Sequence, residues 1–109
     1  MKTIIALTAA ALAAAPAAAL NNDFSNQLKK LSPIQQRATM RRAVLDSGQY
    51  CKRIGPVAYQ APYKNLEMWT VQCDRGATYA VFIGLDASVQ VRPCRDLATL
   101  KLPACRFPK

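Results

Sequence analysis

The order of apolar and polar residues changes its period near Gln49. Before this residue, apolar side chains recur three or four positions apart, which is the spacing of an amphipathic helix. After it, apolar and polar residues alternate in four short runs, which is the pattern of strands with one apolar face. The pattern therefore predicts a helical part followed by a strand part.

Signals at both ends predict a helix from Pro33 to about Ser47. Ser32 can cap the first turn, Pro33 suits the first helical position, and Gln35 completes a capping box. Gly48 suits the residue that follows the last turn. A shorter amphipathic segment is expected before this helix, with apolar residues at Phe24, Leu28 and Leu31.

A helical projection of segment 33–47 gives one broad apolar arc opposite a polar arc. The apolar arc holds Ile34, Ala38, Met40, Val44 and Leu45. Arg37 and Arg41 also fall within it. Either these two side chains run along the edge of the core to water, which we expect, or they point into a groove between helix and sheet. In the second case they and the adjacent Arg42 are our candidates for anion binding.

Four runs with alternating apolar residues predict four strands. Their apolar positions are Val57 and Tyr59, then Trp69, Val71 and Cys73, then Tyr79, Val81 and Ile83, and finally Val89 and Val91. Short segments join the runs, and Gly76 suits a left-handed position in the second of them. Short connections imply an antiparallel meander whose apolar face needs a cover. We therefore expect an α+β fold, with an N-terminal amphipathic helix packed on a four-stranded antiparallel meander.

Residues 1–19 have the features of a secretory signal peptide. Lys2 gives a positive start, an apolar run follows, and Ala17 to Ala19 provide the small residues that signal peptidase accepts. A membrane anchor is the alternative, but a span needs about 20 apolar residues, and Pro16 with Asn21 ends this run early. We expect a periplasmic or secreted single domain, residues 20–109, with no transmembrane segment after cleavage.

The four cysteines of the chain all lie in the expected mature domain, at Cys51, Cys73, Cys94 and Cys105. An even number of cysteines in an oxidising compartment predicts disulfides, which would stabilise a domain of 90 residues whose apolar core is small. No two cysteines form a C-x-x-C pair and the chain has no histidine. This spacing argues against a zinc site or a thioredoxin-like redox centre.

The expected topology also favours one pairing of the cysteines. Cys51 precedes the first strand and Cys73 ends the second, so both lie at the same end of adjacent strands. Cys73 and Cys94 end strands on either side of the third, about 10 Å apart, whereas a disulfide needs Cα atoms within about 7 Å. We therefore predict the disulfides Cys51–Cys73 and Cys94–Cys105, the second closing the C-terminal tail into a small loop.

The side chains offer little for catalysis. Proton transfer and nucleophilic attack need a reactive group beside a partner that tunes it. The chain lacks histidine, its cysteines are expected in disulfides, and its six acidic residues are scattered. Glu67 alone is expected near the apolar face, and its position at a strand edge accounts for it. We predict no catalytic residue, no cofactor and no metal site, and hence a protein that is not an enzyme.

Positive charge is the most unusual property of the composition. The chain has 15 Lys and Arg against 6 Asp and Glu, and removal of residues 1–19 would leave a net charge of +8. Such a charge attracts anionic partners through its summed field. Tyr59, Trp69 and Tyr79 share the parity of the core face, so we expect no stacking platform and no dedicated nucleic-acid partner. The predicted function is a basic binding module for anionic cell-envelope components.

One hairpin motif resembles a known group of proteins. The residues Trp69, Val71, Cys73, Gly76, Tyr79 and Val81 form a W-x-V-x-C-x-x-G-x-x-Y-x-V pattern. With the cysteine and phenylalanine of the tail, this pattern resembles uncharacterised small exported proteins of alphaproteobacteria, which end in a Cys-Phe-Lys-like tail. Arg106 separates Cys105 from Phe107 and departs from that tail. The resemblance, over roughly residues 51–109, implies export, disulfides and a meander, but no activity.

The chain is more weakly similar to periplasmic inhibitors of lysozyme, which also place a cysteine before a D-x-G-like turn in an antiparallel sheet. The positive charge fits this function only for an acidic target, because two cationic surfaces repel. This similarity implies an alternative function, an inhibitor or accessory subunit that binds another exported protein.

Overall fold

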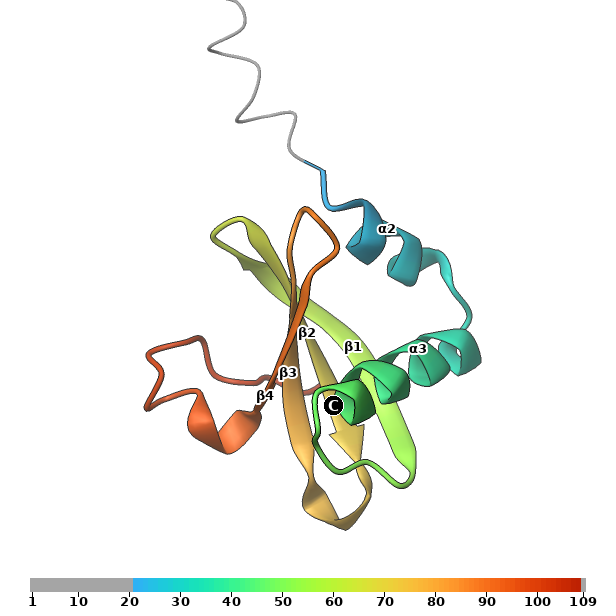
Figure 1. Ribbon diagram of the computed structural model, residues 1–109, viewed down its shortest axis with the longest axis vertical. Helices are drawn as coiled ribbons and strands as arrows, with labels where there is room; N and C mark the ends of the chain where they lie inside the picture. The colour runs from blue at the N-terminus through green and yellow to red at the C-terminus, as the bar shows by residue number, and fades with distance from the viewer. Residues whose placement is uncertain (1–20, 109) are drawn as a thin grey trace, which may run out of the picture.

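A computed structural model describes residues 21–108 and shows two helices and one four-stranded sheet (Figure 1). The elements are α2 (Asp23–Lys30), α3 (Pro33–Asp46), β1 (Ile54–Tyr63), β2 (Leu66–Cys73), β3 (Thr78–Ile83) and β4 (Val89–Pro93), with short 3-10 turns η1 (Asp74–Gly76) and η2 (Cys94–Asp96). The expected signal peptide, residues 1–19, lies outside the described residues. Between residues 21 and 108, no helix is long and apolar enough to cross a membrane.

The sheet is the predicted antiparallel meander, with strand order β1-β2-β3-β4. The turn between β2 and β3 depends on two left-handed residues, Arg75 with φ 59° and Gly76 with φ 73°. Both predicted disulfides are present, Cys51–Cys73 with Cα atoms 5.4 Å apart and Cys94–Cys105 with Cα atoms 5.8 Å apart. The α+β fold class is therefore confirmed.

Helix α3 has the predicted limits, but it buries a narrower stripe than predicted. Its capping box between Ser32 and Gln35 is present. Met40 and Val44 are its buried residues, whereas Ile34, Ala38 and Leu45 are exposed. The predicted apolar arc is too wide, because a helix on a sheet buries only the side chains that point at the sheet. Helix α2 covers the neighbouring part of this face with Leu28, which is fully buried.

The sheet is apolar on both faces, not on one face as predicted. The main cluster lies under the helices and contains Trp69, Val71, Val81 and Ile83. Successive residues of a strand point to opposite faces, and a second cluster of Met68, Ala80, Phe82 and Leu97 lies on the other face. The alternating pattern located the first cluster only, because the second needs the C-terminal tail as its cover.

The C-terminal tail crosses this second face from β4 back to β1 (Figure 1). Leu102 and Cys105 pack against the second cluster. At the far end of the crossing, the side chain of Gln60 donates a hydrogen bond to the carbonyl of Ala104 (2.9 Å) and accepts one from the backbone N–H of Arg106 (2.8 Å). Residues 104–106 are thus tied to both edge strands of the sheet, by the disulfide from Cys105 to Cys94 after β4 and by the side-chain amide of Gln60 on β1.

Candidate functional site

The three arginines predicted as anion-binding residues lie on one surface of α3. They border a shallow cavity of about 580 Å³, which is lined by Ile34, Arg37, Ala38, Arg41, Arg42, Leu45 and Ile54. We call these seven residues the arginine face. Most of its helical residues are three, four or seven positions apart, a spacing that places them on one side of α3. The seventh residue, Ile54, is the first residue of β1.

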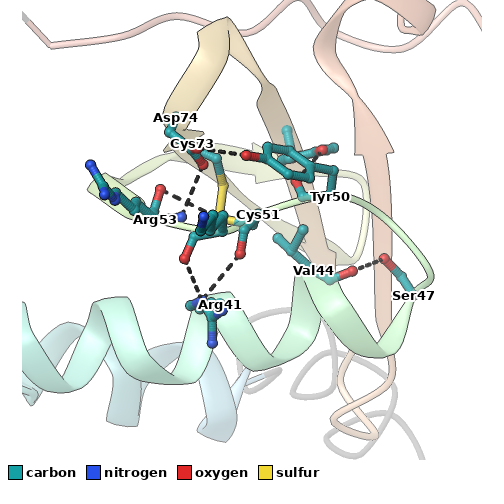
Figure 2. Close-up of a disulfide and its surroundings, with 10 residues drawn as sticks. Arg41, Val44, Ser47, Tyr50, Cys51, Arg53, Cys73 and Asp74 are labelled. Atoms are coloured by element: carbon teal, nitrogen blue, oxygen red, sulfur yellow. Dashed lines mark hydrogen bonds between the residues drawn. A yellow bond between two sulfur atoms is a disulfide. The ribbon is translucent and has the colours of Figure 1, made fainter.

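Arg41 links the arginine face to the first disulfide. Figure 2 shows its side chain directed from α3 to the loop that contains Cys51. Its Nε donates hydrogen bonds to the carbonyl oxygens of Cys51 (3.1 Å) and Lys52 (3.3 Å). The guanidinium of Arg41 therefore neither runs freely to water nor points into a closed groove; it holds the loop, and its position is fixed by that contact.

The other two arginines are less constrained. Arg37 is exposed and has no carboxylate within ion-pair distance among residues 21–108. Arg42 lies 3.8 Å from Asp46, but both side chains are exposed, and such surface pairs contribute about 0 to 1 kcal/mol. Lys52 and Arg53 extend the positive charge into the loop beside Arg41. The arginine face therefore carries an excess of positive charge.

The acidic residue next to this loop serves a structural role. Asp74 accepts hydrogen bonds from the hydroxyl of Tyr50 (2.6 Å) and the backbone N–H of Arg53 (2.9 Å), as Figure 2 shows. The Tyr50 hydroxyl and the Arg53 amide hold the pKa of Asp74 below its ordinary value. The same contact with Asp74 raises the pKa of Tyr50. Because the carboxylate is occupied in this way, it fixes the loop that Arg41 also holds.

A second group of basic residues lies on the opposite face of the molecule. Arg92 pairs with Ala80 across β3 and β4, and cross-strand partners share a face. Ala80 belongs to the second cluster, so Arg92 points away from the helices. The tail that covers this cluster carries Lys101 and Arg106, both exposed. The basic residues thus form groups on two faces instead of one continuous patch.

A second cavity lies on the other side of α3, and sequence reasoning missed it. Its volume is about 390 Å³, and its lining is mainly apolar, with Phe24, Met40, Ala43, Val81, Ile83, Val89 and Val91 among its residues. Arg42 borders both cavities. The alternating apolar residues of β4 were the sequence signal for this cavity. They form an apolar surface that α2 and α3 cover only in part, and Val89 stays exposed.

A polar network around Glu67 accounts for the acidic residue that sequence analysis assigned to a strand edge. Glu67 accepts hydrogen bonds from Tyr59 (2.9 Å), Lys29 (3.3 Å) and Ser25 (3.4 Å). Ser25 also accepts one from the indole N–H of Trp69 (2.9 Å). Burial, the hydrogen bond to Glu67 and its negative charge raise the pKa of Tyr59 to about 12.

This network contains the residue types of a reactive cluster, but solvent does not reach its serine. Ser25 is fully buried, so its hydroxyl cannot meet a substrate without a change in the fold. Its bonds instead attach α2 to the sheet. Among residues 21–108, no group of three or more His, Cys, Asp or Glu residues is placed to hold a metal ion.

Comparison with known proteins adds no family to these observations. The chain matches no protein-family model, no curated protein sequence and no solved structure. No residue role can therefore be carried over from a relative, and the resemblance of the hairpin to exported proteins stays a prediction.

Proposed function

We propose that this protein is an exported, non-enzymatic binding module that attaches to anionic components of the cell envelope through the arginine face. The observation that carries the proposal is the placement of Arg37, Arg41 and Arg42 around one cavity. The net charge of +8 on residues 20–109 supports it. The two disulfides support an oxidising compartment, because disulfides are rare in the cytosol.

Guanidinium groups suit this function for a physical reason. They are planar, stay charged at all relevant pH values and present several donors, so they bind phosphate in a bidentate manner. Arg37 and Arg42 keep their side chains at the surface, where an anion can reach them. A basic side chain near an anionic surface contributes about 1 kcal/mol. Several of them together give useful affinity without a deep pocket.

The proposal predicts that two charges on the arginine face matter more than two elsewhere. Arg37→Gln with Arg42→Gln should weaken binding to dextran sulfate and to phosphatidylglycerol vesicles by about 30-fold, at about 1 kcal/mol per charge. The matched control, Arg92→Gln with Arg106→Gln, removes the same charge from the opposite face and should weaken binding by only about threefold, through the summed field. Titration by isothermal calorimetry at low salt measures both.

Two comparisons test the proposal: binding at low and at high salt, and binding of the two double variants. Binding should weaken steeply as salt rises, since the screening length falls to about 3 Å at 1 M. Equal losses in the two double variants would show that the whole charge, not the arginine face, attracts the anion. An absence of binding to either probe would overturn the proposal.

The alternative, an inhibitor or accessory subunit of another exported protein, has one feature in its favour. The apolar cavity between α3 and β4 would suit a protein side chain better than an anion. This alternative predicts a stoichiometric complex that persists at high salt, because apolar contacts are not screened. A crosslinking pull-down from the periplasm at high salt would detect such a complex.

A further inference from the structure

Helix α3 is apolar on two sides, and within residues 21–108 only one of them packs against other elements. Met40 and Val44 face the sheet and are buried. Ile34 and Leu45 lie on the arginine face, and Ile34 is 79% exposed, more than any other large apolar residue described. An exposed isoleucine by itself is ordinary, but this one shares its side of the helix with Ala38 and Leu45. The fold does not explain this outer apolar stripe.

The charges around the stripe indicate what could cover it. Arg37, Arg41 and Arg42 alternate with the apolar residues along the same side of α3. Long cationic side chains that flank apolar ones on the same surface can reach the head groups of a bilayer, while the apolar side chains meet the acyl boundary. The tail also exposes Leu100 and Phe107, but only to 45% and 38%.

We propose that the arginine face docks on an anionic phospholipid bilayer, with the side chain of Ile34 entering the boundary between head groups and acyl chains. This inference rests on the proposed function and names its anionic component. Helix α3 has 14 residues, which corresponds to about 21 Å. A helix of this length can lie flat on the bilayer, with Arg37 and Arg42 at the depth of the phosphates.

A bilayer fits the arginine face better than a soluble polyanion does. A polyanion neutralises the arginines but leaves Ile34 and Leu45 in water, whereas a bilayer supplies both negative charge and an apolar phase. The helix is also a rigid support: its N-terminus has a capping box at Ser32 and Gln35, and its middle is held by the bonds from Arg41 to the Cys51 loop. Docking therefore requires no unfolding.

The first experiment compares two apolar variants on two probes. Ile34→Gln should weaken binding to equimolar phosphatidylglycerol and phosphatidylcholine vesicles by about tenfold, because burial of an isoleucine side chain is lost. It should leave binding to dextran sulfate unchanged. The matched control Leu100→Gln, in the tail, should change neither. Both positions are exposed, so thermal unfolding should confirm that each variant folds as the original does.

The second experiment places a reporter at the same positions. In Ile34→Trp, addition of the same vesicles should shift the added tryptophan's emission to shorter wavelength, and brominated lipids should quench it. Dextran sulfate should produce no shift. In Leu100→Trp, vesicles should produce no shift either. Because Trp69 is buried and present in every variant, it contributes a constant background.

The outcomes separate this inference from the proposed function. If Ile34→Gln binds vesicles as well as the original protein does, and Ile34→Trp shows no shift, the bilayer inference is wrong while anion binding stands. Binding to dextran sulfate without binding to vesicles leads to the same conclusion. Undiminished binding to pure phosphatidylcholine vesicles also contradicts the inference, because the arginines would then be irrelevant. A failure of both probes to bind removes the proposed function itself.

Discussion

The carboxylate of Glu67 on β2 connects its own strand to the neighbouring strand β1 and to the distant helix α2. It accepts bonds from Tyr59 on β1 and from Lys29 and Ser25 on α2. Helix α2 has only eight residues, and isolated helices of that length are unstable in water. We infer that α2 persists because Leu28 is buried beneath it and because Glu67 fixes its polar side. The sequence could not predict this network, since residues as much as 44 positions apart form it.

Tyr59 makes this attachment sensitive to high pH. Folding raises its pKa from 10.0 to about 12, so the folded state favours the neutral phenol. The resulting stability is fully present below about pH 10 and is lost as pH rises through about 12. The original protein should therefore lose stability between about pH 9 and about pH 11 more steeply than Tyr59→Phe does. Urea unfolding midpoints at both values measure this, and parallel losses would contradict the assignment.

At the scale of the elements, the limits of helices, turns and disulfides could be predicted from the sequence. Which face of each element packs against another element could not. The limits of α3, the turn at Gly76 and the two disulfides followed from caps, a left-handed residue and strand order. The period of a helix or strand identifies apolar residues, but it does not reveal which of two faces will be covered. For this reason the sequence placed Ile34 in the core and missed the cluster around Phe82. The sequence made the arginines anion-binding candidates in only one of two alternatives, the one in which Arg37 and Arg41 point into a groove between helix and sheet.

The C-terminal disulfide should stabilise the second face without affecting the first. Cys94→Ala with Cys105→Ala should lower the free energy of unfolding by about 3 kcal/mol, because the loop is released in the unfolded chain. It should also increase the binding of a hydrophobic dye, as the tail separates from Met68 and Phe82. Vesicle binding, measured where the variant is still folded, should persist. Its loss under those conditions would show that the tail takes part in docking.

At the scale of the whole molecule, the two groups of basic residues lie on opposite sides of the sheet. The helices and the arginine face occupy one side, and the basic tail occupies the other (Figure 1). If α3 rests on a bilayer, the residues Arg92 and Arg106 face away from it. The core between the two sides contains the single tryptophan of the chain, Trp69, which is 1% exposed.

Trp69 should therefore report unfolding but not docking. Addition of phosphatidylglycerol vesicles should leave its emission maximum and its quenching by acrylamide unchanged, because docking through α3 leaves the core closed. Urea should shift the emission to longer wavelength. A shift caused by vesicles in the original protein would mean that the core opens on the membrane, which would contradict rigid docking.

The two bonds between Gln60 and the tail have a consequence for the growing polypeptide. The tail residues Leu102 and Cys105 pack on the cluster of Met68 and Phe82, so this face stays uncovered until the tail has left the ribosome. Closure of this face must then follow synthesis of all four strands and the tail.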